Sequence, residues 1–306
     1  MGLLISVLEQ GMIYAIMALG IYITYKILDF PDLTVDGSFP MGAAITAIMI
    51  TNGCPAILSL PAAFAVGALT GILTGLIHVK LKVTDLLSGI IMMTALYTVN
   101  LRIAGRANLP FYKEETVFEN ALTNSVFTGS LGSFKTVIVM LVILLVVKLL
   151  LDAYLQTGSG FLLRAVGDNA SIVTAMGEDR GKMKILGLAI ANGLVSLSGC
   201  LLAQQQRFFE ISMGTGTMVI GLASVIIGTS LYQKLDSMGK MPAILHKVRV
   251  GIITASVILG SIVYKACVAI AIRLGLKTQD LKLVTAVLFL MILVLSMEKK
   301  RTKKDA

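Results

Sequence analysis

Two polar stretches interrupt an otherwise apolar sequence, and their side chains could contact a polar solute inside a membrane. The first stretch is FPDLTVDGSFP at residues 30–40, and the second is EISMGTGT at residues 210–217. Carboxylates, hydroxyls and the backbone groups freed where a helix is broken can hold such a solute. The alternative is that both stretches are ordinary surface loops. The residues that we predict to line a solute pathway are Asp32, Thr34, Asp36, Ser38, Met213, Thr215, Gly216 and Thr217.

Motifs for hydrolysis or cofactor binding are missing from the sequence. The glycines at 214–216 follow no predicted strand, and the next glycine comes too late for a dinucleotide-binding loop. The Gly-Lys pairs at 181–182 and 239–240 lack the upstream glycine of a nucleotide-binding P-loop. His78 and His246 have no second ligand at helical spacing, so we predict no metal site. We therefore expect a protein without catalytic residues and without a cofactor.

The composition places these stretches in a membrane protein. Hydrophobic residues make up 56% of the 306 residues, charged residues make up 14%, and the mean hydropathy is +0.88. Several apolar runs reach about 20 residues, enough to cross a hydrocarbon core of about 30 Å as a helix. We predict an all-α polytopic membrane protein with about eight or nine transmembrane helices, some broken or re-entrant. The predicted spans are 3–26, 39–52, 56–79, 84–105, 135–153, 185–205, 213–232, 247–272 and 281–297.

The basic residues predict the orientation of these spans. The net charge is +9, and Lys and Arg concentrate on the cytoplasmic side of membrane proteins. We therefore place the basic tail, 298–306, in the cytoplasm and do not expect nucleic acid as a partner. An odd number of crossings then puts Met1 outside. The first apolar run lacks the features of a cleavable leader, so we expect it to remain as the first helix.

The two polar stretches occupy matching places in two halves of one transmembrane domain, 1–306. The first half covers about 1–134 and the second about 155–297, and the fifth span lies between them. With an odd number of crossings between the halves, their topologies are opposite. Interrupted helices at matching places in such halves indicate a transport pathway.

A third polar segment, 155–184, lies on the predicted cytoplasmic side and carries a short amphipathic helix. Asp168 and Asn169 are suitable residues to cap its start, and Gly177 is suitable to end it. The residues predicted to share its apolar face are Ile172, Val173 and Met176. A helix this short is marginal in water, so it must press against the membrane surface or a second protein.

The whole chain resembles the membrane permease subunits of ABC importers of the branched-chain amino acid and ribose type. Three stretches carry the resemblance: GMIYA to ALG at 11–20, DFPDLTVDGS at 29–38, and LRAVGDNA at 163–170. The amino-acid sequence of the second stretch is similar to that of a subgroup of permeases found with tryptophan- or tyrosine-type binding proteins. That similarity implies an amino acid as the solute, with an aromatic one such as tyrosine or tryptophan favoured.

The resemblance also implies partners and a location. It implies a multi-pass protein of the bacterial inner membrane, a second permease subunit that forms a homodimer with the first, a separate cytoplasmic ATPase and an extracytoplasmic solute-binding protein. The ATPase would dock on the segment around 168–177, and the usual Glu-Ala-Ala sequence of such coupling helices is replaced here by Asn-Ala-Ser at 169–171. The residues expected to couple the permease to the ATPase are Arg164, Asp168, Asn169, Ala170, Ile172, Val173, Met176 and Gly177.

Two questions stay open at the level of sequence. Asp32 or Asp36 could contact the ammonium group of an amino acid, or could instead cap the helix that follows. Glu9 lies within the first span, where a carboxylate is costly, and it suggests a proton-coupled secondary transporter as the alternative function. A membrane scaffold without transport activity is a third possibility.

Overall fold

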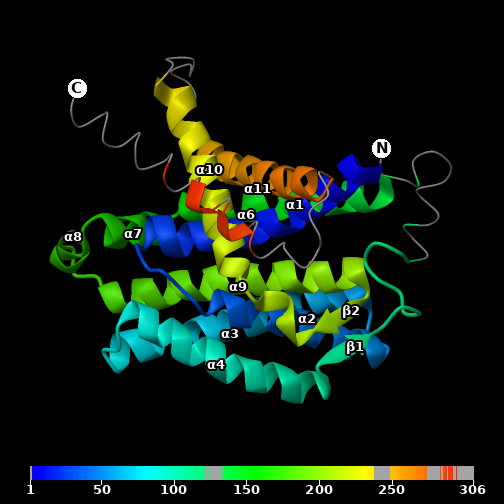
Figure 1. Cartoon of the computed structure of the whole chain (residues 1–306). Coiled ribbons are helices and arrows are strands. Elements are labelled where there is room, and N and C mark those ends of the chain that lie inside the picture. Colours follow the sequence, from blue (N-terminus) through cyan, green and yellow to red (C-terminus); the bar gives the residue numbers. More distant parts are fainter. Residues whose placement is uncertain are drawn as a thin grey trace.

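The computed structural model describes residues 2–120, 134–237 and 249–273, together with single residues and short pieces between 123 and 294. Most of the long helices lie side by side, with their ends gathered at two opposite ends of the molecule, whereas α10 (Thr217–Ser237) runs steeply across them (Figure 1). The described elements are α1 (Gly2–Ile21), η1 (Tyr22–Ile27), α2 (Val35–Thr51), η2 (Ala56–Leu58), α3 (Ser59–Lys80), α4 (Asp85–Ala104), β1 (Asn108–Pro110), α6 (Lys135–Leu155), α7 (Gly158–Asp168), α8 (Ala170–Ala175), α9 (Arg180–Gln206), β2 (Phe208–Glu210), η4 (Ile211–Gly214), α10 (Thr217–Ser237) and α11 (Arg249–Arg273).

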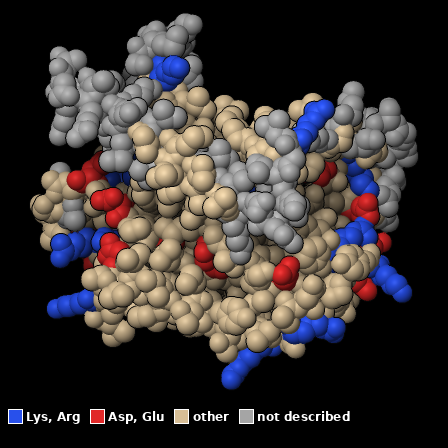
Figure 2. Space-filling view, in the orientation of Figure 1, with Lys and Arg blue, Asp and Glu red and all other residues tan. Residues whose placement is uncertain are grey.

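The chain is an all-α polytopic membrane protein. Within the described residues, seven helical spans are long and apolar enough to cross a membrane, and α2 is a shorter apolar helix. The predicted ninth span, 281–297, and the basic tail lie outside the continuously described ranges. On the face shown in Figure 2, most Lys and Arg side chains lie toward the edges, and the broad centre is largely uncharged. This distribution is the one expected for helices whose flanks contact lipid.

The two ends of the molecule differ in what they carry. The segments α7 and α8 lie at one end, together with the end of α3 and the beginning of α9, whereas β1, β2 and the start of α1 lie at the other (Figure 1). The first end also holds His78, Lys80 and Arg180, and its position in the cytoplasm stays a prediction. The segment 155–184 is therefore at the end of the helices and not between them.

Helix α9 forms the centre of the fold. Its residues are mostly buried along its length, which is why its sequence is apolar on all sides and shows no single hydrophobic face. Helices α3 and α2 pack along it, and α3 approaches it through Gly67, Gly71 and Gly75. Small residues at a helix interface let the two backbones come close, and close packing drives helix association in lipid.

Each half of the chain packs one of its helices against a helix of the other half. Helix α3 of the first half packs on α9 of the second half, and α11 of the second half packs on α1 of the first. Near the middle of the second pair, Gly11 makes room for Ile262, and the Ser261 hydroxyl donates to the Gly11 carbonyl oxygen at 2.9 Å. Such an exchange is expected when two halves are related by a pseudo-two-fold axis.

Replacing Gly71 by alanine should destabilise the α3–α9 interface. A methyl group at this position would lie 2.1 Å from the Leu188 carbonyl oxygen, so the two backbones would have to separate. Overpacking of this kind costs about 1–3 kcal/mol. We expect the melting temperature of Gly71→Ala in detergent to be several degrees lower than that of the wild type. Because the chain has no tryptophan, unfolding is followed with a thiol-reactive dye or by light scattering. Gly2→Ala is the matched control, because nothing lies within 4 Å of that position. Equal melting temperatures for both variants would contradict this account of the interface.

Three boundaries differ from those predicted. Helix α2 begins at Val35 and not at residue 39, so Pro40 lies inside it as its sixth residue and leaves the Asp36 carbonyl oxygen without its usual helical donor. The span predicted at 213–232 begins as a 3-10 turn and becomes α-helix only at Thr217. Two three-residue strands, β1 and β2, pair antiparallel at the end opposite α7, with Leu109 facing Phe209. Strands this short have no alternating pattern that a sequence could reveal.

Candidate functional site

Asp36 joins the two predicted pathway stretches. It lies in the first turn of α2, yet its carboxylate accepts hydrogen bonds from the beginning of α10. Its Oδ2 atom accepts from the Gly216 N–H at 3.0 Å, and its Oδ1 atom accepts from the Thr217 hydroxyl at 2.9 Å and from the Met218 N–H at 2.8 Å. The two stretches, far apart in sequence, therefore form one structural unit.

This contact satisfies the start of α10. The first N–H groups of a helix have no partner within the helix, and an anion is favoured beside them. Gly216 has φ of +83°, a conformation that glycine adopts without strain, and it aims these N–H groups at Asp36. Gly214 brings η4 so close that a side chain there would meet the Asp36 carbonyl oxygen at 2.0 Å. Of the two roles considered for this carboxylate, the structure shows capping, although it caps α10 and not the helix that follows in sequence.

Asp32 begins a second, fully buried polar cluster. Its Oδ2 atom accepts from the Asn192 side-chain amide at 2.7 Å, and its Oδ1 atom accepts from the Thr34 N–H at 2.9 Å. The Asn192 amide oxygen accepts in turn from the Ser38 hydroxyl at 2.7 Å. These contacts hold the loop before α2, and the first turn of α2, against the centre of α9.

Two threonines of α3 complete this cluster. The Thr70 hydroxyl lies 2.9 Å from that of Ser38, and the Thr74 hydroxyl lies 2.9 Å from that of Thr34. Thr70, Thr74 and Asn192 were not among the predicted site residues. The signal was available, because the two threonines are four residues apart and so share one face of an apolar helix, and polar residues in such helices usually point inward.

The predicted pathway residues therefore divide into three groups. Asp36, Gly216 and Thr217 meet at the start of α10, and Asp32, Thr34 and Ser38 belong to the buried cluster on α9. Met213 is half-buried and packs against the apolar core, and Thr215 is exposed. Asp36 and Gly216 are also half-buried.

The segment 155–184 contains two helices, α7 and α8, where one was predicted. Helix α7 begins at Thr157, whose hydroxyl accepts from the Gly160 N–H, and it buries Leu163 and Val166. Gly167 lies so close to the end of η1 that a side chain there would clash with the Ile27 carbonyl oxygen. Helix α7 was not predicted because three of its eleven residues are glycines, which interrupt the hydrophobic pattern in the sequence. Helix α7 is therefore packed directly against the end of the first membrane span.

The ends of α8 follow the sequence prediction in part. Asn169 caps it, because its side-chain oxygen accepts from the Ser171 N–H at 3.1 Å. Asp168 does not cap α8, since it is the last residue of α7. Gly177 has φ of +81°, and the Glu178 N–H donates to the Val173 carbonyl oxygen at 3.2 Å, which is a glycine-type helix end.

The predicted shared face of α8 is wrong. Val173 is fully buried, whereas Met176 lies just beyond the helix end and is 60% exposed. The helix ends at Ala175, so Met176 lies outside it and does not continue the helical face that carries Val173. Arg164, on α7, is turned back toward the membrane domain, where its guanidinium donates to the Leu155 carbonyl oxygen at 3.1 Å. Ala170 and Ile172 lie on α8, but their side chains are outside the described part of the structure.

A polar cavity of about 840 Å³ lies beside this segment. It is bounded by the end of α3, the start of α4 and the start of α9. His78 is one of its lining residues, with its Nδ1 atom 3.2 Å from an Asp85 carboxylate oxygen and its Nε2 atom 3.2 Å from the Lys184 ammonium. Within the described ranges, no group of three His, Cys, Asp or Glu residues could hold a metal ion.

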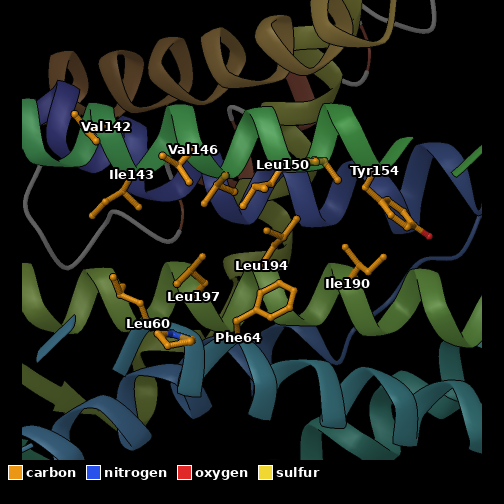
Figure 3. A pocket seen from close by; sticks show the side chains of 13 residues that line it. Leu60, Phe64, Val142, Ile143, Val146, Leu150, Tyr154, Ile190, Leu194 and Leu197 are labelled. Atoms are coloured by element: carbon orange, nitrogen blue, oxygen red, sulfur yellow. The ribbon is translucent and has the colours of Figure 1, made fainter. Parts of the chain in front are cut away.

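A second cavity, of about 720 Å³, lies between α6 and the pair α3–α9. Figure 3 shows side chains of α6 pointing across it toward those of α9, with Leu60 and Phe64 of α3 on the same side as α9. Twelve of its thirteen lining residues are apolar, and the other is Tyr154. Burying a charged solute in such surroundings without polar partners is strongly unfavourable, so this cavity is not a route for one.

The fold and these contacts describe a polytopic membrane protein whose two interrupted helices, α2 and α10, meet at the Asp36 carboxylate. The family model described as "Branched-chain amino acid transport system / permease component" matches residues 3–297. The chain belongs to this family of ABC transporter permeases and is a multi-pass protein of the inner membrane.

Named relatives extend the comparison. The chain is 40% identical over 287 residues to the tyrosine transport system permease protein of Clostridioides difficile, covering 94% of this chain and 89% of that protein. It is 30% identical over 226 residues to the probable branched-chain amino acid transport permease protein LivH of Methanocaldococcus jannaschii, covering 70% of each. It is 25% identical over 231 residues to the ribose import permease protein RbsC of Haemophilus influenzae, covering 74% of this chain and 69% of that protein. No solved structure matches the chain significantly.

Proposed function

We propose that this permease forms the transmembrane pathway of an ATP-driven importer for an amino acid, with an aromatic one such as tyrosine or tryptophan favoured. A second copy of the chain completes the pathway, a separate ATPase docks on α7 and α8, and an extracytoplasmic binding protein delivers the solute. The observation that carries this proposal is the contact of Asp36 with the start of α10, because it joins the broken helices of both halves at one point. An interrupted helix in each half is the feature expected at a solute site.

A continuous path of contacts leads from α7 to this point. Gly167 of α7 lies against Ile27, at the end of the first span, and the side chains of Leu163 and Leu28 both approach Gly187 of α9. The loop that follows Leu28 carries Asp32, which is bonded to Asn192 of the same helix. A movement of α7 and α8 would therefore shift the loop before α2 together with α9.

The cycle follows from this path. Closure of the ATPases on nucleotide moves α7 and α8 as rigid levers, and α2 moves with the loop that precedes it. Since Asp36 fastens α2 to α10, the two broken helices move together, and the pathway changes the side to which it is open. The permease contributes solute contacts that differ between the two states, and the separate ATPase supplies the energy.

The proposed solute class rests on the relatives and on the resemblance of residues 29–38. One relative is named for tyrosine and another for branched-chain amino acids, whereas a more distant one is named for ribose. The two relatives named for amino acids have higher sequence identity to this chain than the relative named for ribose, which favours an amino acid as the solute. The proton-coupled alternative gains no support from Glu9, because this residue is half-buried near the outer end and accepts a hydrogen bond from Gln205 at 3.1 Å.

The solute is best identified with the partner binding protein. We expect its melting temperature to rise with L-tyrosine or L-tryptophan more than with L-leucine, and not with ribose, in a thermal-shift screen. Proteoliposomes that contain the permease and its ATPase should then take up the same amino acid. A binding protein that responds only to a sugar would contradict the proposed solute class.

A further inference from the structure

Lys265 places an ionisable amino group deep inside the membrane domain. It lies on α11, sixteen residues after Arg249 and eight before Arg273, or roughly 24 Å and 12 Å from the two helix ends at 1.5 Å per residue. Its ammonium nitrogen lies 3.5 Å from the centre of the Tyr14 ring of α1. An ionisable residue at this depth is costly and usually faces the interior of the helix bundle.

Lys265 has no acidic partner among the described residues. The ion pairs found in that part of the chain involve His78, Lys135, Lys148 and Arg207 as the basic members. A ring face attracts a cation, but it does not supply the negative charge that a desolvated ammonium needs. Lys265 and Tyr14 are each half-buried, and the ammonium lies over the ring face of Tyr14.

Aromatic contacts connect Lys265 with the proposed pathway. The Tyr14 ring stacks on that of Phe39, with centroids 5.8 Å apart and an interplanar angle of 21°. Phe39 is fully buried in α2 and lies three residues after Asp36, which places both on the same side of that helix. The charged ends of this arrangement are Lys265 and Asp36, and the aromatic pair lies between them.

We propose that Lys265 binds the carboxylate of the amino acid during its passage, with Tyr14 holding the ammonium in place and forming one wall of the site. This inference rests on the proposed function and adds to it a residue that recognises the solute class. A lipid phosphate would supply the same negative charge, but lipid headgroups lie at the membrane surface, and Lys265 lies about 12 Å from the nearer helix end.

The test uses proteoliposomes that contain the full-length permease with its ATPase and binding protein, and labelled L-tyrosine or L-leucine. We expect Lys265→Met to lower the uptake rate by about tenfold or more, which is the effect of losing one charge-assisted hydrogen bond. Lys265→Arg should retain most of the uptake. Lys113→Met, at an exposed lysine of the outer loop, is the matched control and should behave as wild type. Tyramine, which lacks the carboxylate, should not be taken up by any of them.

The outcomes separate this inference from the proposed function. If wild type and Lys265→Met took up the amino acid at equal rates, the proposed carboxylate site would be overturned, whereas the proposed importer function would still stand. Equal losses in Lys265→Met and Lys265→Arg would also overturn it, because the charge would not be the cause. ATPase association and elution volume in detergent check that each variant is folded. Absence of amino acid uptake by wild type would overturn both proposals.

Discussion

Alanine in place of Asp36 is expected to reduce uptake of the amino acid by about a hundredfold, while the permease still binds its ATPase. The variant loses three hydrogen bonds between one carboxylate and the start of α10. A net loss of about 3 kcal/mol corresponds to a factor of this order. Without the contact, α2 can move while α10 stays behind. The measurement is the initial rate of ATP-dependent uptake in proteoliposomes.

Two further variants sharpen this result. Asp36→Asn retains one oxygen acceptor but loses the negative charge beside the helix start, so its uptake should lie between those of wild type and Asp36→Ala. Asp29→Asn removes a carboxylate that is exposed on the adjacent loop and should leave uptake unchanged. If Asp36→Ala and Asp29→Asn took up solute at the same rate, Asp36 would have no part in transport.

Aspartate at Met176 should weaken association with the ATPase by at least about tenfold. Met176 is 60% exposed beside α8, and the proposed interface would bury it. A charge buried there without a partner costs several kcal/mol, and truncating or charging a central interface residue commonly has effects of this size. Association is measured in detergent with the purified ATPase, by titration and by co-elution.

The control for this variant is Leu81→Asp. Leu81 is 69% exposed at the same end of the molecule, between α3 and α4, but it lies outside α7 and α8. We expect this variant to bind the ATPase as wild type does. Unchanged binding by Met176→Asp would remove α8 as the docking element, whereas equal loss in both variants would mean that the interface is broader than α7 and α8.

Much of the fold could be predicted from the sequence, because membrane helices must satisfy their own hydrogen bonds and therefore appear as long apolar runs. The spans that became α1 with η1, α3 with η2, α4, α6 and α11 were placed within about two residues, whereas α9 begins at Arg180 and not at residue 185. The boundaries failed at α2 and α10. In both regions glycine, proline and polar residues begin a helix that is completed by contacts from a distant part of the chain, and local patterns carry no information about such contacts.

The candidate site shows the same limit. Composition alone marked Asp36 and Gly216 as unusual residues in a membrane domain, but the bond between them joins residues 180 positions apart. Asn192 was missed because a single amide in an apolar helix has no periodic signal. The shared face assigned to Val173 and Met176 was wrong because α8 ends at Ala175, a boundary set by Gly177 and by the bond from Glu178 to Val173.

The source of energy for uptake tests the central claim most directly. Proteoliposomes are prepared with the permease and its binding protein, with and without the ATPase, and labelled L-tyrosine or L-leucine is supplied together with either ATP or an imposed proton gradient. The account predicts uptake only when the ATPase and ATP are both present, and loss of this uptake in Met176→Asp. Uptake driven by the proton gradient without the ATPase would contradict it.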